Sequence, residues 1–102
     1  MSRLGVVKVV GNSGTQYRFL AYPLTTVFRK GRSVVYLTTC RRTRQDAPSK
    51  HRRIGLGQTD DVRRLLTDQG KSLAAGGANC ICVCGEPDSR TRLAIQRDLG
   101  GT

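Results

Sequence analysis

The sequence predicts an α+β fold: a small antiparallel or mixed sheet core flanked by helices, in a single domain of residues 1–102. Three observations lead to this prediction. A chain of 102 residues fits one small domain. Short β-branched and aromatic runs fill its first half, and two capped amphipathic segments lie in its second half. The expected element order is therefore β-β-β-β-α-β-α, without an internal repeat, which is typical of α+β proteins.

Four strands are expected before the first helix. The segments GVVKVVG (5–11) and TQYRFLAY (15–22) form a hairpin across the turn sequence GNSG. SVVYLTTC (33–40) is the clearest strand, because it is β-branched and aromatic. A basic loop is expected over residues 41–52, followed by a brief strand, RIGLG, at 53–57.

The first helix is predicted over residues 59–70. Thr59 can cap it, and Asp60 and Asp61 favour the positive end of its dipole. Gly70 suits its exit.

One strand and one helix complete the predicted fold. Residues 72–78 form a small-residue linker or a fragment of helix, and NCICVCG (79–85) is a buried strand. The last helix is expected over 86–101, with Asp88 or Ser89 as its cap.

The charge of the chain is strongly asymmetric. The net charge is +11. Residues 1–58 hold 12 Lys and Arg against one acid, Asp46, whereas residues 59–102 hold six of each sign. The densest cluster consists of Arg41, Arg42, Arg44, Lys50, Arg52 and Arg53. Such a cluster attracts a polyanion, so we expect nucleic acid as a partner. The alternative is a solvated basic loop that binds nothing in particular.

The four cysteines do not form a disulfide framework in this prediction. Cys80, Cys82 and Cys84 alternate, so a strand places them on one face, where they pair poorly with one another. A metal site would need Cys40 and His51 to complete a ligand set. We expect buried reduced thiols and no metal.

No apolar run approaches the length of a membrane span, and the first ten residues are too broken for a signal peptide. The expected location is therefore cytoplasmic, with no membrane contact.

Three segments, VVYL, GLGQTDDVRRLL and AIQRDL, resemble in order and spacing the GIY-YIG nuclease family. The resemblance covers residues 33–100, so residues 1–32 would be an added N-terminal β-hairpin. It implies a GIY-YIG-like core in which Tyr36 is the tyrosine of the first motif and a remnant of the catalytic site.

The other catalytic positions that this resemblance implies are substituted. Gly55 stands at the second tyrosine, while Gly57 keeps the motif's glycine. Leu65 stands at the catalytic arginine, and Gln96 at the metal-binding glutamate. Mg²⁺ binds through carboxylates, so glutamine is a poor ligand. The resemblance thus implies a nuclease fold whose reaction is lost.

The leading expectation is a catalytically impaired GIY-YIG-like domain that binds nucleic acid non-specifically through the basic loop. The residues expected to contact it are Arg41, Arg42, Arg44, Lys50, Arg52, Arg53, Arg63 and Arg64. One alternative is a residual endonuclease, dependent on Mg²⁺, that uses Tyr36, Arg63 or Arg64, and Asp98. Another is a protein-interaction module, in which the basic face meets an acidic partner or the N-terminal hairpin pairs by its edge strand.

Overall fold

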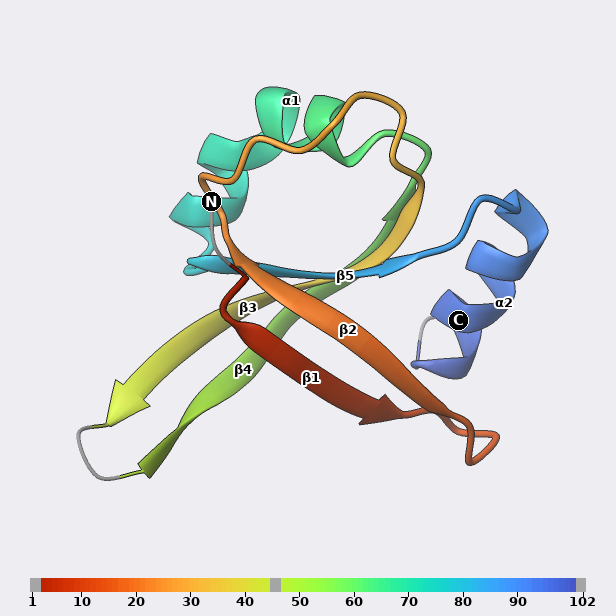
Figure 1. Ribbon diagram of the computed structural model, residues 1–102, viewed down its shortest axis with the longest axis horizontal. Coiled ribbons are helices and arrows are strands. Elements are labelled where there is room, and N and C mark those ends of the chain that lie inside the picture. The colour runs from red at the N-terminus through yellow and green to blue at the C-terminus, as the bar shows by residue number, and fades with distance from the viewer. Residues whose placement is uncertain (1–2, 45–46, 101–102) are drawn as a thin grey trace.

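The fold was established from a computed structural model, which describes residues 3–44 and 47–100 of the chain, with side chains at all of these except 44 and 47–49. It contains one five-stranded sheet and two helices (Figure 1). Every strand pairing in the sheet is antiparallel. The predicted α+β class is therefore confirmed.

The elements follow the predicted order. They are β1 (Gly5–Val10), β2 (Gln16–Pro23), β3 (Val34–Arg44), β4 (Ala47–Thr59), α1 (Val62–Ala75), β5 (Cys80–Gly85) and α2 (Ser89–Asp98). Their spatial order in the sheet is β1-β2-β5-β3-β4. The two hairpins, β1–β2 and β3–β4, therefore form the two edges, and β5 lies between them. β5 lies in the middle of the sheet and is covered on both faces, which explains why its sequence is an almost continuous apolar run.

The two helices pack on opposite faces of the sheet. Val62 of α1 packs with Ile81 and Val83, and we call this side the α1 face. Leu99, directly after α2, packs with Leu37 on the other side, which we call the α2 face. Because side chains alternate along a strand, neighbouring residues of β3, β4 and β5 contribute to different faces.

The segment 41–52, expected to be a loop, is a two-stranded ribbon. β3 continues to Arg44 and β4 begins at Ala47. Long cationic side chains are compatible with this ladder because β4 is an edge strand, exposed to water. An edge strand also accepts Pro48, which lacks a backbone N–H. We call residues 40–44 and 47–53 the basic ribbon. In Figure 1 it extends away from the helices at the lower left.

A bulge separates the basic ribbon from the rest of the sheet. Thr38 lies opposite Gly55, but Thr39 lies opposite Arg53, so Ile54 has no opposite residue. An extra residue of this kind bends the strand and increases its twist. The ribbon therefore leaves the packed part of the sheet at this point.

Helix α1 differs from the prediction at both ends. Asp61, not Thr59, is its cap, because the Asp61 carboxylate accepts the backbone N–H of Arg64 at 3.2 Å. The helix also passes through Gly70 and ends at Ala75, so the predicted exit at Gly70 is wrong. The left-handed conformation that favours glycine after a helix occurs at Gly77, with φ of 100°.

Helix α2 begins as expected. Asp88, one of the two predicted caps, accepts the backbone N–H of Arg90 at 2.9 Å.

Candidate functional site

The basic ribbon carries cations on both of its faces. Opposed residues of an antiparallel pair point to the same side of the sheet. Arg41 lies opposite His51, on the α2 face, and Arg42 lies opposite Lys50, on the α1 face. Cys40, Arg42, Lys50, His51 and Arg52 line a hollow of about 500 Å³. The charged side chains therefore surround a concave surface of the folded chain.

These cations have no acidic partners among the side chains that the structure describes. The one ion pair found there joins Arg64 to Asp60, at 2.9 Å. Arg42, Lys50 and Arg52 are exposed. Arg53 is also exposed, but it donates to the Leu99 carbonyl at 2.9 Å and so binds the ribbon base to the end of α2. For Arg44, the structure describes the backbone alone.

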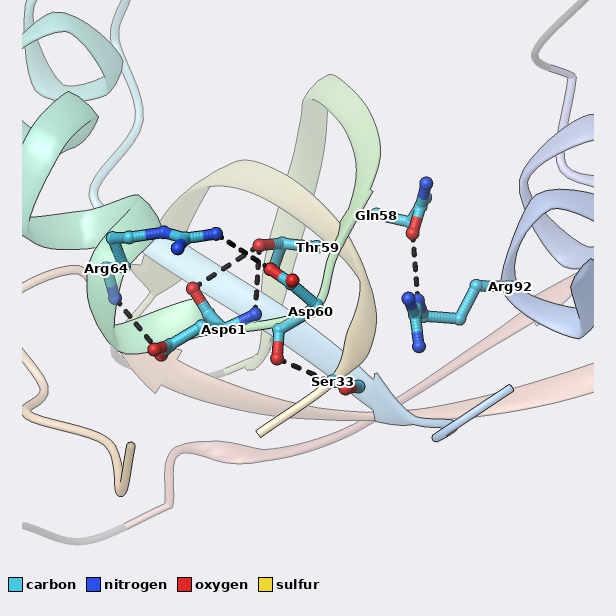
Figure 2. A network of polar contacts seen from close by, with 7 residues as sticks. All are labelled: Ser33, Gln58, Thr59, Asp60, Asp61, Arg64 and Arg92. Carbon is cyan, nitrogen blue, oxygen red and sulfur yellow. Dashed lines mark hydrogen bonds and ion pairs between the residues drawn. The ribbon is translucent and has the colours of Figure 1, made fainter. Parts of the chain in front are cut away.

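Arg63 and Arg64, also predicted to contact nucleic acid, lie apart from the ribbon. They sit in the first turn of α1, and only its far end approaches the ribbon, where Gly77 lies near the Arg52 guanidinium. Twelve residues of helix separate Arg64 from Gly76, or about 18 Å. Figure 2 shows the Arg64 guanidinium held by Asp60 next to the Asp61 cap. The eight predicted cations therefore form two groups, not one.

Tyr36 packs against a glycine on the neighbouring strand. It is half-buried on the α1 face, opposite Gly57, and burial raises the pKa of its hydroxyl. A Cβ atom on Gly57 would lie 2.5 Å from the Tyr36 hydroxyl oxygen, and one on Gly55 would lie 2.7 Å from Oγ1 of Thr38. The two glycines thus leave room for the Tyr36 and Thr38 side chains to lie across them, and a tyrosine at 55 would require Thr38 to move.

The positions of the nuclease resemblance are not all brought together. Leu65 is partly buried on the α1 face, in the same cluster as Tyr36. Gln96 belongs to α2; its neighbour Ile95, and Leu99 directly after the helix, pack on the opposite face. The sheet therefore separates Gln96 from Tyr36 and Leu65.

Asp98, the acid of the residual-nuclease alternative, is bonded to the β1–β2 turn. Its carboxylate accepts the Ser13 N–H at 2.7 Å, the Ser13 hydroxyl at 2.6 Å and the Tyr17 hydroxyl at 2.7 Å. These bonds, the Ser13 hydroxyl first, lower the pKa of Asp98, and the same carboxylate raises the pKa of Tyr17. Asp98 therefore has a structural role at this turn.

Arg92 is a buried cation that the sequence did not single out. Its guanidinium donates to Gln58 Oε1 at 2.8 Å and to the carbonyls of Glu86 and Pro87 at 3.0 and 2.9 Å. Figure 2 shows the bond between Arg92 of α2 and Gln58 of β4. These bonds engage two of the three guanidinium nitrogens and join α2 to the sheet.

A thiol–imidazole cluster lies at the base of the basic ribbon. One donor atom from each of His51, Cys80 and Cys82 lies within 4.8 Å of the other two. Such a donor set can hold a metal ion. His51, one of the two residues that a metal site was expected to need, is half-buried, with Nδ1 2.9 Å from Oγ1 of Thr39. Cys40, the other expected completing ligand, is not part of this cluster.

The thiols of the cluster influence each other. The hydrogen bond between them lowers the pKa of Cys80 and raises the pKa of Cys82, and Arg41 adds to the lowering at Cys80. Desolvation, followed by the charge of Arg41, lowers the pKa of His51. All four cysteines of the chain are free. Sequence alternation correctly placed Cys80 and Cys82 on one face, but the approach of His51 depends on the ribbon register.

Comparison of the chain with protein-family models, with curated proteins and with solved structures finds no match. Within residues 3–44 and 47–100, no helix has the length and apolar character needed to cross a bilayer.

Proposed function

We propose that this chain binds nucleic acid non-specifically, through the phosphates, using the basic ribbon, and does not cleave it. The observation that carries the proposal is the group of exposed cations Arg42, Lys50 and Arg52 around one hollow, none of them paired with an acid among the described side chains. Phosphates are bound by cations of this kind without reading of the sequence.

The shape of the ribbon, like its charge, supports this function. A two-stranded antiparallel ribbon fits the major groove of a DNA duplex. Cations on both ribbon faces, such as Arg41 and Arg42, can then meet the phosphates on both sides of a groove. The ribbon also projects from the packed body, so a polyanion can approach it without contact with the helices (Figure 1).

The resemblance to the GIY-YIG family remains part of the proposal. The adjacent antiparallel strands β4, β3 and β5, with α1 following β4, support it. Loss of cleavage is supported by the bonding of Asp98 to the β1–β2 turn, whereas the separation of Gln96 from Tyr36 by the sheet counts against the resemblance. We also keep a cytoplasmic location within the proposal, since four free thiols fit a reducing compartment.

Binding as a function of salt concentration tests this function. Fluorescence anisotropy with duplex DNA, single-stranded DNA and duplex RNA gives the slope of log K against log salt. That slope is about −0.9 per phosphate contact on B-DNA. In the triple variant Arg42→Gln/Lys50→Gln/Arg52→Gln we expect the magnitude of the slope on duplex DNA to fall by about 2–3 and the affinity at low salt to fall at least about tenfold.

A matched control removes the same charge elsewhere. Lys8→Gln/Arg18→Gln/Arg90→Gln also replaces two arginines and one lysine, all exposed and outside the ribbon. We expect its slope to stay within one unit of the unmodified chain. Equal losses in both triple variants would show a diffuse effect of net charge and would contradict a ribbon site. Stronger competition by polyglutamate than by DNA at equal charge would instead favour an acidic protein partner.

Incubation of supercoiled plasmid with Mg²⁺ or Mn²⁺ tests the absence of cleavage. We expect no nicking above a protein-free control. Nicking that Arg64→Ala abolishes would contradict the proposed loss of the reaction, because Arg64 is a cation of the residual-nuclease alternative.

A further inference from the structure

We propose that His51, Cys80 and Cys82 bind one thiophilic d¹⁰ metal ion, Cu⁺ or Zn²⁺, at the base of the basic ribbon. The proposal does not depend on nucleic-acid binding, and its test uses no nucleic acid.

The sheet brings three donors together from two strands that are not neighbours. Cys80 and Cys82 are both fully buried and two residues apart on β5, so they share one face. His51 comes from β4, and β3 lies between β4 and β5. Strand spacing places β4 and β5 about 10 Å apart. The imidazole extends toward the thiols over Thr39, a small residue that lies opposite Cys80, and the donor atoms come within 4.8 Å of one another.

The donor types select the metal. Two thiols and one imidazole are ligands for Zn²⁺ and Cu⁺, whereas Mg²⁺ and Ca²⁺ require oxygen ligands. Donor atoms in the cluster lie within 4.8 Å of one another. Sulfur atoms around a tetrahedral zinc ion lie about 3.8 Å apart, as follows from Zn–S bonds of about 2.3 Å. The required contraction of about 1 Å is within the reach of side-chain rotation.

A buried donor beside the cluster provides an independent indication. Nε of Arg41 is buried and has no hydrogen-bond partner among the residues that the structure describes. Arg41 lies opposite His51 and on the same ribbon face. A buried N–H without an acceptor is unfavourable, and a metal-bound thiolate supplies both an acceptor and a negative charge.

The local charge favours Cu⁺ over Zn²⁺. Two thiolates and the Arg41 guanidinium sum to −1, so Cu⁺ gives a neutral site and Zn²⁺ a charge of +1. A net charge is unfavourable at a buried position. The cluster also supplies three protein donors, which suffice for Cu⁺, whereas Zn²⁺ would need a fourth donor such as water. We therefore expect tighter binding of Cu⁺.

Metal titration of the full chain in its reduced form tests this site. Cu⁺ is titrated anaerobically against a chromophoric Cu⁺ chelator, and Zn²⁺ against a zinc indicator. Co²⁺ serves as a spectroscopic substitute, because thiolate ligation gives sulfur-to-cobalt charge-transfer absorption. We expect one ion per chain, this absorption, and a rise in Tm of roughly 10 °C at a hundredfold excess of metal over its Kd.

Variants distinguish the cluster from other thiols. His51→Gln keeps every cysteine and changes only a half-buried side chain, so it tests the site without emptying the core. We expect it to lower metal affinity at least about 100-fold, since even the loss of an outer partner of a ligand costs 10–100-fold. Cys80→Ser and Cys82→Ser should abolish the charge-transfer absorption.

The control variant Cys40→Ser/Cys84→Ser removes the two cysteines that lie outside the cluster. It should bind Cu⁺ and Zn²⁺ as tightly as the unmodified chain. The proposal is overturned if none of the three ions binds with thiolate absorption, or if the control loses as much affinity as His51→Gln. In either case Cys80 and Cys82 are thiols that pack as small apolar side chains.

Discussion

The hairpins at the two edges of the sheet end in different ways. The β1–β2 turn is bonded to α2: the Asn12 N–H donates to the Asp98 carbonyl at 2.7 Å, and Ser13 and Tyr17 donate to the Asp98 carboxylate. A Cβ atom on Gly11 would overlap that same carboxylate. The outer part of the β3–β4 hairpin is the basic ribbon, where no described side chain pairs with an acid. One hairpin end therefore serves the fold, and the other leaves its charges available.

This difference shows where function can be located in so small a protein. A ligand site needs polar groups that the fold has not already satisfied. The Asp98 carboxylate already accepts three hydrogen bonds from the β1–β2 turn. Within residues 3–44 and 47–100, no described acid pairs with Arg42, Lys50 or Arg52, and all three side chains are exposed. The ribbon is held in shape mainly by its ladder, with bonds from Arg53 to Leu99 and from Asn79 to Arg41 at its base, whereas the rest of the sheet is held by its apolar core.

The largest predicted difference in stability between the packed sheet and the basic ribbon is found within a single strand, β3. Leu37 lies in the packed part of the sheet, before the bulge; it is 2% exposed and packs in the core of the α2 face. Leu37→Ala should lower the free energy of unfolding by about 2–5 kcal/mol, because it removes apolar contacts and leaves a cavity. Arg42→Gln, five residues further along the strand, should change it by less than about 0.5 kcal/mol. Urea denaturation measures both, and equal losses would show that the ribbon contributes to the core.

A smaller loss of stability is expected from a substitution at Gly57 of β4, which lies opposite Tyr36. Gly57→Ala places a Cβ atom 2.5 Å from the Tyr36 hydroxyl, so the half-buried ring must shift. We expect a loss of roughly 1–3 kcal/mol in the free energy of unfolding. Gly85→Ala is the matched control, because its Cβ atom meets nothing within 4 Å. That variant should be neutral or stabilising by about 0.5 kcal/mol. A neutral Gly57→Ala would show that the ring is mobile.

Much of the fold follows from local patterns in the sequence. All seven elements were predicted in the correct order, because β-branched runs, alternation and capping residues act over short distances. Helix α1 was predicted too short, since one interior glycine costs only about 1 kcal/mol and the segment after Gly70 still favours helix. The sequence predicts a loop at the basic ribbon because its dense charge and Pro48 are poor strand signals. Pairing between β3 and β4 outweighs those local preferences.

The sites were less predictable than the fold because they depend on register. The alternation of Cys80 and Cys82 can be seen in the sequence, but His51 joins them only through the pairing of β4 with β3. Residues 13 and 98 likewise meet across 85 positions of sequence. No local pattern indicates a contact at that separation. The charge cluster of the ribbon was visible because it needs composition alone.

The bond between Asp98 and the β1–β2 turn gives the smallest predicted effect, and it depends on pH. The pKa of Asp98 is lowered in the folded protein, so its contribution to stability is present above the ordinary carboxyl pKa of about 4 and is lost as pH falls through the lowered value. The Tm difference between the unmodified chain and Asp98→Asn should therefore be largest at neutral pH and shrink below about pH 4. The Ser13 amide shift in NMR spectra should titrate over the same range, because this amide donates directly to the carboxylate. A Tm difference that is constant down to pH 2 would show that the carboxylate charge is not what holds the turn, and the backbone bond from Asn12 to the Asp98 carbonyl would then be the main link between the turn and α2.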